Sequence, residues 1–197
     1  MPLRTESDED LLVRVRNHDE NALRELLARY YARLCEFAFT LLRRRDLAEE
    51  AVSNVFLNLW RRRETLQVNG VLRSYLFAAA GNQSLNLRKQ QLRNATVWLD
   101  DVPHSQLIDG ARPEGDLLYK ELQGEIDALI MCLPPQRQLI FRMNRIEGLR
   151  YAEIAEALGV SEHTVQNHMV QAVRQLAPQL PPLRDSLERD RTRTPFE

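Results

Sequence analysis

The segment YAEIAEALGVSEHTV, residues 151–165, decides how the second half of this 197-residue chain folds. Its first eight residues have the apolar spacing of a short helix, Gly159 stands where a left-handed turn is needed, and Ser161 is a favoured cap for a second helix that runs to about Ala177. This order predicts a helix-turn-helix, a motif whose second helix binds DNA. We expect its buried positions to be Ile154, Leu158, Val160, Val165 and Met169.

The second helix of this motif is expected to expose a polar face. Its buried side should consist of Val165, Met169, Ala172 and Leu176, which leaves these residues pointing outward: Glu162, His163, Gln166, Asn167, Val170 and Arg174. Gln and Asn can pair with adenine, Glu can accept from cytosine, and Arg can bind guanine or phosphate. His163 and His168 are interpreted as polar surface or groove residues, because no carboxylate or cysteine joins them at metal-ligand spacing.

Helical periodicity also dominates the first half of the chain. Ser7 is expected to cap a short helix that ends near Val15. The next helix carries a broad apolar stripe, formed by Leu23, Leu26, Leu27, Tyr30, Tyr31, Leu34, Phe37, Ala38 and Leu41. The run of arginines at 43–45 with Asp46 ends this helix.

A third helix is predicted over Leu47–Arg63, and its two sides differ in character. The side expected in the core holds Ala48, Val52, Val55, Phe56 and Leu59. The opposite side mixes leucine with charge, at Leu47, Glu50, Asn54, Leu57 and Arg61. Leucines among charges indicate either a protein partner or burial by a neighbouring helix, and both interpretations stay open at this point.

A break at residues 67–70 precedes a fourth helix that extends to about Arg93. Its buried stripe is expected at Leu72, Leu76, Ala79 and Leu87. Another face carries an aromatic ring, amides and cations, at Tyr75, Asn82, Asn86, Lys89 and Arg93. Such a face can stack on unpaired bases and hold phosphate, which makes it a candidate single-strand platform, although an ordinary solvated helix face has the same composition.

The net charge of −1 hides an uneven distribution, with +4 over residues 1–95, −6 over 96–130 and +1 over 131–180. Residues 96–116 lose all periodicity and are acidic, so they are predicted to link two domains. Further helices are expected at Leu117–Met131 and Gln136–Ile146. Two basic-leaning blocks around an acidic one remain compatible with a nucleic-acid partner.

Several classes of protein are excluded. No apolar run approaches the ~20 residues of a membrane span, and the first twenty residues are too charged for a secretory signal, so a cytoplasmic protein without direct membrane insertion is expected. Cys35 and Cys132 lie far apart in apolar surroundings with no CxxC motif. We therefore expect no metal site, and the sequence predicts neither a cofactor nor catalytic residues.

The order of these parts resembles one known family. The segments DLAEEAVSNVFLNLWRRR (46–63), VLRSYLFAAAGNQSLNLRK (71–89) and LPPQRQLIFRMNRIEGLRYAEIAEALGVSEHTVQNHMVQAVRQL (133–176) are similar, in this order, to segments of the group IV, extracytoplasmic-function (ECF) sigma factors of bacterial RNA polymerase, in the sigma-70 family. The resemblance implies an all-α fold of two helical domains. Residues 1–95 would form sigma region 2, 96–116 an acidic irregular linker, 117–178 the helix-turn-helix domain of sigma region 4, and 179–197 a flexible tail.

The resemblance also implies roles and partners. Core RNA polymerase would be bound through its β′ clamp helices and β flap, the clamp helices contacting Leu47, Glu50, Asn54, Leu57 and Arg61. The loop at 64–69 would capture a flipped base of the minus 10 element, and that element and its melting would involve Gln67, Asn69, Tyr75, Asn82, Asn86, Arg88 and Lys89. The minus 35 element of promoter DNA would be read by Glu162, His163, Gln166, Asn167, His168 and Arg174. An anti-sigma factor, of the membrane-bound kind that often controls this subgroup, is a further expected partner.

This chain departs from the family pattern at three places. Ser53 and Asn54 stand where many members carry Gln and an acid, Gly81 replaces a common Arg, and His168 replaces another, so a phosphate contact at 168 would depend on pH. The rival hypotheses are a stand-alone helix-turn-helix regulator and an all-helical adaptor without DNA contact. A regulator would have no use for the F-x-x-x-W helix and the basic, amide-bearing helix after it.

Overall fold

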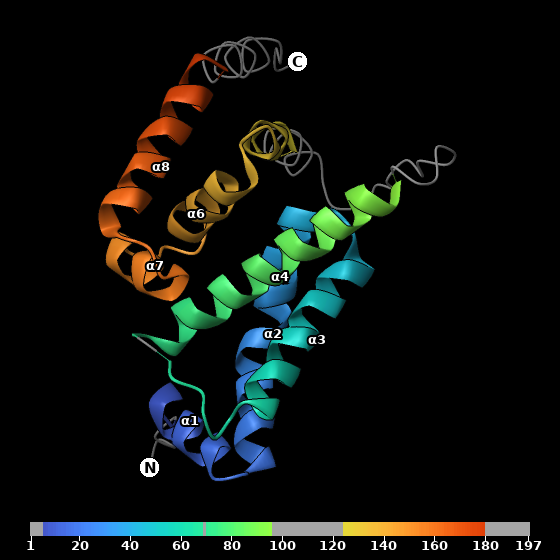
Figure 1. The fold of residues 1–197 in the computed structure, drawn as a ribbon, viewed down its shortest axis with the longest axis vertical. Coiled ribbons are helices and arrows are strands. Elements are labelled where there is room, and N and C mark those ends of the chain that lie inside the picture. The colour runs from blue at the N-terminus through green and yellow to red at the C-terminus, as the bar shows by residue number, and fades with distance from the viewer. Residues whose placement is uncertain (1–5, 69, 96–123, 180–197) are drawn as a thin grey trace, which may run out of the picture.

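The computed structural model describes residues 6–68, 70–95 and 124–179, and within these ranges every regular element is a helix (Figure 1). The first bundle consists of α1 (Asp8–Arg16), α2 (Glu20–Leu42), α3 (Arg45–Arg61) and α4 (Leu72–Ala95). A helical segment at 124–131 opens the second bundle. It continues with α6 (Pro135–Arg145), α7 (Tyr151–Leu158), α8 (Glu162–Leu176) and the short 3-10 turn η1 (Ala177–Gln179).

The helix ends follow from local chemistry, as the sequence predicts. Ser7 Oγ accepts a hydrogen bond from the Asp10 amide, and Ser161 Oγ accepts one from the Thr164 amide, both at 3.1 Å. Gly159 ends α7 with φ +66°, the left-handed conformation that glycine adopts without strain. The expected linker at 96–116 and most of the expected tail at 179–197 lie outside the described residues.

The first bundle buries the stripe that periodicity predicts for α2. Leu26, Leu34, Phe37, Ala38 and Leu41 are buried, and the remaining apolar residues of the stripe are partly buried against them. Phe37 meets Phe77 of α4 edge to face, with ring centroids 5.1 Å apart. The inward side of α3 is likewise confirmed, since Ala48, Val52, Val55, Phe56 and Leu59 are all buried.

The expected stripe of α4 is only partly correct. Leu72 and Leu76 are buried, whereas Ala79 and Leu87 are only half-buried. Buried positions also occur around the rest of the helix, at Phe77, Ala78, Ala80, Gly81 and Ser84. The reason is that α4 is covered from two sides: α2 and α3 pack against it on one side, and α6 and α7 on the other.

The two bundles therefore share one hydrophobic core, in which Leu139, Met143 and Ile154 of the second bundle join residues of the first. Polar contacts surround this core. Arg88 Nη1 of α4 donates to Gln138 Oε1 of α6 at 3.1 Å. Glu147, on the turn after α6, is buried against the first bundle.

Glu147 is the most deeply buried carboxylate at the contact between the bundles. Arg33 Nε donates to its Oε2 at 2.9 Å, and Arg73 Nη2 donates to its backbone carbonyl and lies 3.7 Å from Oε2. Burial raises the pKa of Glu147, and the two arginines oppose that effect. The packing of the two bundles therefore places the Glu147 carboxylate in a poorly solvated site. The two arginines compensate only partly for the lost hydration of its charge.

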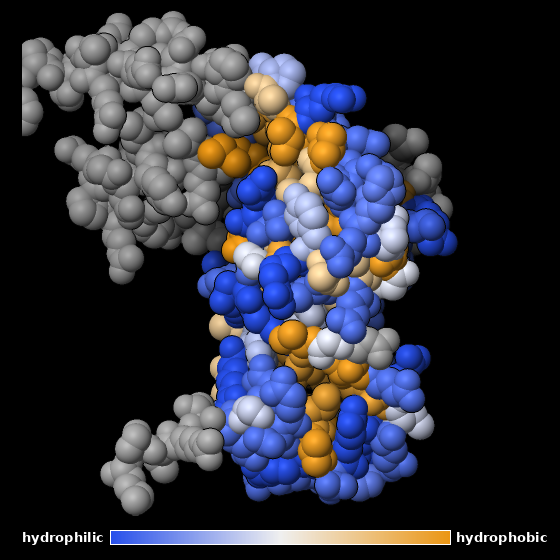
Figure 2. Space-filling model, turned by 90° about the vertical axis from the view of Figure 1, so that its left-hand side faces the viewer, coloured by the Kyte–Doolittle hydropathy of each residue, from blue (hydrophilic) through white to orange (hydrophobic). Residues whose placement is uncertain are grey.

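On the face that Figure 2 shows, the coloured surface is mostly hydrophilic, and apolar side chains lie in patches among the hydrophilic ones. Within the described ranges, none of the helices combines the length and the apolar character that a membrane span requires.

Candidate polymerase and nucleic-acid interfaces

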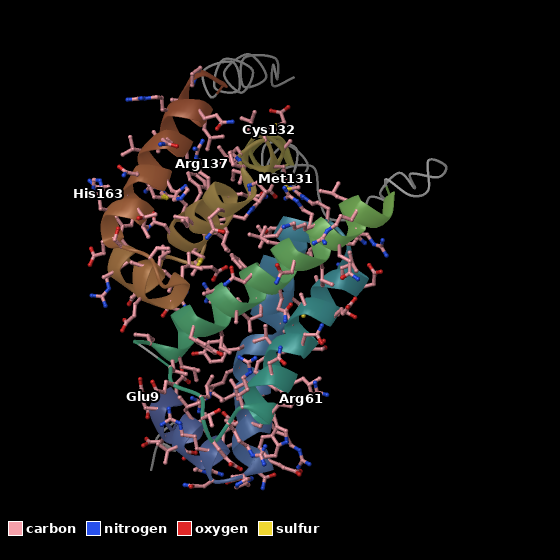
Figure 3. The ribbon with its side chains drawn as sticks, viewed as in Figure 1. Glu9, Arg61, Met131, Cys132, Arg137 and His163 are labelled. Carbon is pink, nitrogen blue, oxygen red and sulfur yellow. The ribbon has the colours of Figure 1, made fainter. Side chains whose placement is uncertain are left out.

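The face of α3 expected to bind polymerase is largely exposed. Glu50, Leu57 and Arg61 are exposed, with Leu57 at 43%, and Asn54 is half-buried. These four residues follow one another at steps of four, three and four, so they lie on one stripe of the helix. Figure 3 shows Arg61 projecting away from the bundle.

Leu47 does not belong to this exposed stripe, and its expected position was wrong. Its exposed fraction is 9%. Leu47 stands four residues before Ala51, which is fully buried, and α3 contacts both α2 and α4. Residues four apart share a side of a helix, so the buried arc of α3 is wider than periodicity predicts and includes Leu47.

The amide-bearing face of α4 is open. Asn82, Asn86 and Lys89 are exposed and lie at steps of four and three along one side of the helix. Tyr75, one turn from the start of α4, is half-buried, and this burial raises the pKa of its hydroxyl. The face therefore offers two amides and a cation to a ligand, with an aromatic ring at its N-terminal end.

Arg88 differs from its neighbours on α4. Its guanidinium donates to Gln138 across the contact between the bundles, so in this arrangement it is engaged with protein. Gln67 is exposed just before α4. Asn69 lies outside the described residues.

The recognition face of α8 agrees with the sequence analysis at five positions. Glu162, His163, Gln166, Asn167 and Arg174 are exposed, and Val170 is 51% exposed among them. The buried side holds Val165, Met169, Ala172 and Leu176, as expected. Figure 3 shows His163 projecting outward from α8, while Arg137 lies between α6 and α8.

His168 turns toward α6 instead. It is half-buried, and its Nδ1 is buried and has no hydrogen-bond partner among the described residues. Burial lowers the pKa of His168, and repulsion from Arg137 lowers it further. His168 is therefore neutral near pH 7, and a phosphate contact that requires its positive charge is disfavoured there.

A cluster next to the segment between α3 and α4 was not predicted from the sequence. Arg63 Nε donates to Nδ1 of His18 at 2.9 Å, and the other ring nitrogen of His18 lies 3.2 Å from Glu64 Oε1. Arg16 Nη2 donates to the Leu66 carbonyl at 3.1 Å. No periodicity could reveal this cluster, because its members are 45 to 50 residues apart.

Neither cysteine forms part of a ligand set. Cys35 and Cys132 are free thiols, and no group of three or more His, Cys, Asp or Glu side chains in the described part of the chain has the arrangement of a metal site.

Comparison with known proteins identifies the two domain types. The family model for sigma-70 region 2 matches residues 26–94, and that for sigma-70, region 4, matches residues 123–176. The ECF RNA polymerase sigma-E factor of Haemophilus influenzae is 24% identical over 184 residues, which cover 90% of this chain and 97% of that protein. The RNA polymerase sigma-H factor of Pseudomonas aeruginosa is 22% identical over 92% of this chain and 97% of its own.

Solved structures show the same fold. CnrH, solved in complex with the cytosolic domain of CnrY, superposes with a TM-score of 0.66 at 16% identity, over 90% of this chain and 99% of that one. The sigma factor RpoE of Bartonella quintana, solved with the anti-sigma factor NepR, superposes with a TM-score of 0.63 at 18% identity, over 80% of this chain and 96% of that one. Two helical bundles in the order of regions 2 and 4, together with relatives that align over nine-tenths of the chain, show that the chain belongs to the sigma-70 family, in its extracytoplasmic-function group.

Proposed function

We propose that this sigma factor, which directs promoter-specific transcription initiation, uses its two bundles for different contacts with polymerase and promoter DNA. The first bundle docks on core RNA polymerase through α3 and holds the opened minus 10 element with α4. The second reads the minus 35 element with α8. The observation that carries this division is that α4 and α8, in different bundles, each expose a polar face: Asn82, Asn86 and Lys89 on α4, and Gln166, Asn167 and Arg174 on α8.

The face of α8 suits the major groove of duplex DNA. Gln166 and Asn167 can each pair with the edge of an adenine, Glu162 can accept from a cytosine, and Arg174 can hold guanine or phosphate. His163 lies at the N-terminal end of the same face, where recognition helices contact bases. His168 is left out of this set because its Nδ1 is buried and Arg137 of α6 lies close enough to lower its pKa.

The face of α4 suits a single strand. Asn82 and Asn86 can bind base edges that pairing no longer occupies, and Lys89 can hold the backbone. Gln67 and Asn69 in the preceding segment, with Tyr75, would capture a flipped base. Arg88 would join this set only after its bond to Gln138 is broken.

The polar faces of α4 and α8 cannot contact the two elements of one promoter at the same time while the bundles are packed together. Elements centred near minus 10 and minus 35 are roughly 25 base pairs apart, or ~85 Å at ~3.4 Å per pair. α4 is only ~36 Å long at ~1.5 Å per residue, and it packs directly on α6 and α7, against which α8 lies. The bundles would therefore separate in the polymerase complex, with residues 96–116 spanning the gap.

The exposed stripe of α3 is the proposed docking surface for the β′ clamp helices, with Leu57 as its apolar centre between Glu50, Asn54 and Arg61. The β flap would hold the second bundle. An anti-sigma factor is a further proposed partner, supported by the structural relative RpoE of Bartonella quintana, which was solved with the anti-sigma factor NepR. The acidic charge of residues 96–116 would repel DNA and suit a path through the polymerase toward the RNA exit. All these steps take place in the cytoplasm, and none requires the chain to act as an enzyme.

One reconstitution tests the proposal. The purified chain is mixed with core polymerase and a promoter library in the absence of any inhibitory protein, and transcript starts are mapped. We expect defined starts downstream of a shared pair of elements. Leu57→Glu should abolish joining to core polymerase, whereas Val13→Glu, at an apolar position of α1 that is 52% exposed against 43% for Leu57, should not. Failure to join core polymerase, or specific promoter binding without polymerase, would favour the stand-alone regulator instead.

A further inference from the structure

We propose that the end of α1 and the turn between α1 and α2 position the segment between α3 and α4 for minus 10 recognition, through Arg16, the last residue of α1, and His18 in the turn. They contact the segment that connects α3 to α4, whose residues 64–69 capture a base in the proposed function, on which this inference rests. Neither residue lies on a DNA-facing helix. Their effect would pass through the backbone and side chains of that segment.

The turn itself is held firmly. Asp19 caps α2 by accepting from the Asn21 and Ala22 amides, and its other carboxylate oxygen accepts two hydrogen bonds from Arg14 at 2.9 and 2.7 Å. His18, between Asn17 and Asp19, adopts φ +65°, a left-handed conformation that is uncommon for a residue with a side chain. The turn is therefore a fixed support.

From this turn the imidazole of His18 reaches the C-terminal end of α3. Arg63 is always a donor, so its 2.9 Å bond makes Nδ1 of His18 the acceptor and assigns the ring proton to Nε2. Nε2 can then donate to Glu64, 3.2 Å away. One side chain thus binds both residues at the start of the connecting segment.

Arg63 is held in place by more than His18. Its guanidinium lies over the ring of Trp60, 4.4 Å from the centroid, and its Nη1 donates to the Trp60 carbonyl at 2.7 Å. Trp60 belongs to α3, the proposed polymerase-binding helix. The cluster therefore connects the end of α3 to the segment between α3 and α4 that would capture the base.

Arg16 acts further along the same segment. Its Nη2 donates to the Leu66 carbonyl at 3.1 Å, next to the exposed Gln67. Leu66 and Val68 are partly buried against the core, so the segment is fastened on both sides of Gln67. A base-reading side chain must be held within a narrow range of positions to discriminate among bases, and these contacts supply that restraint.

The test uses the whole chain assembled with core polymerase. His18→Gly removes the imidazole and keeps the left-handed backbone that glycine adopts freely. Arg43→Gly is the matched control, because Arg43 also has a positive φ, at the opposite end of α2. Arg16→Ala removes the second contact, and Arg16→Lys keeps one donor for the Leu66 carbonyl.

Each holoenzyme initiates transcription on a library randomised in both promoter elements, and its affinity for core polymerase is measured in parallel. We expect His18→Gly and Arg16→Ala to lower the enrichment of the preferred minus 10 bases about fivefold or more, with minus 35 preference and core affinity unchanged. Arg43→Gly and Arg16→Lys should behave like the unmodified chain. Amide hydrogen exchange over residues 64–68 should be faster in the first two variants.

The other outcomes separate this inference from the proposed function. If Gln67→Ala flattens the minus 10 preference while His18→Gly does not, the positioning role is wrong and the proposed function stands. If the unmodified chain shows no minus 10 preference, both are wrong. If His18→Gly weakens core binding in proportion to initiation, the turn acts only through α3 or the fold, and the inference is overturned.

Discussion

Leu139 of α6 lies directly over Gly81 of α4: a Cβ added to Gly81 would stand 2.2 Å from Leu139 Cδ1 and 3.1 Å from Cδ2. Gly81 is buried in a helix, where glycine is otherwise unfavourable by ~1 kcal/mol relative to alanine. Its lack of a side chain is what allows the second bundle to approach α4 so closely. An arginine side chain at this position would not fit beneath Leu139 as it now lies.

Gly81→Arg should therefore separate the two bundles. The long cation needs space that Leu139 now fills, and its burial without a partner would be strongly unfavourable. We expect a larger radius of gyration by small-angle scattering, with little loss of thermal stability within the first bundle because arginine favours helix more than glycine does. Gln90→Arg, at an exposed position of the same helix, should leave the radius unchanged. An unchanged radius in Gly81→Arg would show that α6 can shift to accommodate the side chain.

Glu147→Gln should not weaken the contact between the bundles at pH 7. Burial raises the pKa of Glu147, so the folded protein binds this proton more tightly than the unfolded chain does, and the ionised form is disfavoured by folding. The stability contributed by the group is full below the ordinary pKa of 4.5 and is lost as the pH rises through the raised value. We expect the melting temperature of Glu147→Gln to equal or exceed that of the unmodified chain at pH 7.

The stability advantage of Glu147→Gln should shrink at lower pH. As the pH falls from 7 toward about 4.5, Glu147 takes up its proton, and the unmodified chain should gain stability relative to Glu147→Gln. Glu49→Gln, which changes the same formal charge at an exposed position of α3, serves as the control. A large loss of stability in Glu147→Gln at pH 7 would mean that the bonds from Arg33 and Arg73 outweigh desolvation.

Gln166→Ala should change the bases preferred in the minus 35 element. A lost pair of hydrogen bonds to a base edge corresponds to ~1–3 kcal/mol of discrimination at one position. Library selection with the holoenzyme measures this change. Gln171→Ala is the matched control, because Gln171 lies on the same helix and accepts from Arg137 of α6. A uniform loss on all sequences would show that Gln166 contacts only the DNA backbone.

Asn82→Ala should impair promoter opening more than binding to closed duplex. Its exposed amide is available to a base only after the strands separate, so a pre-melted minus 10 element should restore activity. Permanganate footprinting and initiation on both templates distinguish the two steps. Gln90→Ala should behave like the unmodified chain on either template. Normal opening of duplex by Asn82→Ala would refute this role.

Features that depend on residues close together in the sequence were predictable. The caps at Ser7 and Ser161, the left-handed Gly159 and the buried side of α8 all agree with the structure. Each rests on hydrogen bonds or apolar spacing within a few residues, which the amino-acid order alone determines. The two domain types, and with them the family, follow from the same local patterns.

The exposure of individual residues at the candidate interfaces could not be predicted from local sequence patterns alone. Leu47 was expected outside and is buried, His168 was expected toward DNA and turns to α6, and Arg88 was expected to be free for DNA and binds Gln138. In each case a second helix covers a side that periodicity along one helix assigns to solvent. The periodicity of a sequence shows which sides of a helix are apolar. It does not show which other helix packs against each side.

The amino-acid sequence by itself thus determined the helices, many of their ends and the exposed polar faces of α4 and α8, because these depend on contacts three or four residues apart. Only the tertiary structure decided that Arg33 and Arg73 meet Glu147, that His18 reaches Arg63, and that Gly81 lies beneath Leu139. Arg33 and Glu147 are 114 residues apart in the chain. Contacts at such separations arise from how whole helices pack, and a side chain acquires its burial, its partner and its pKa only when that packing is complete.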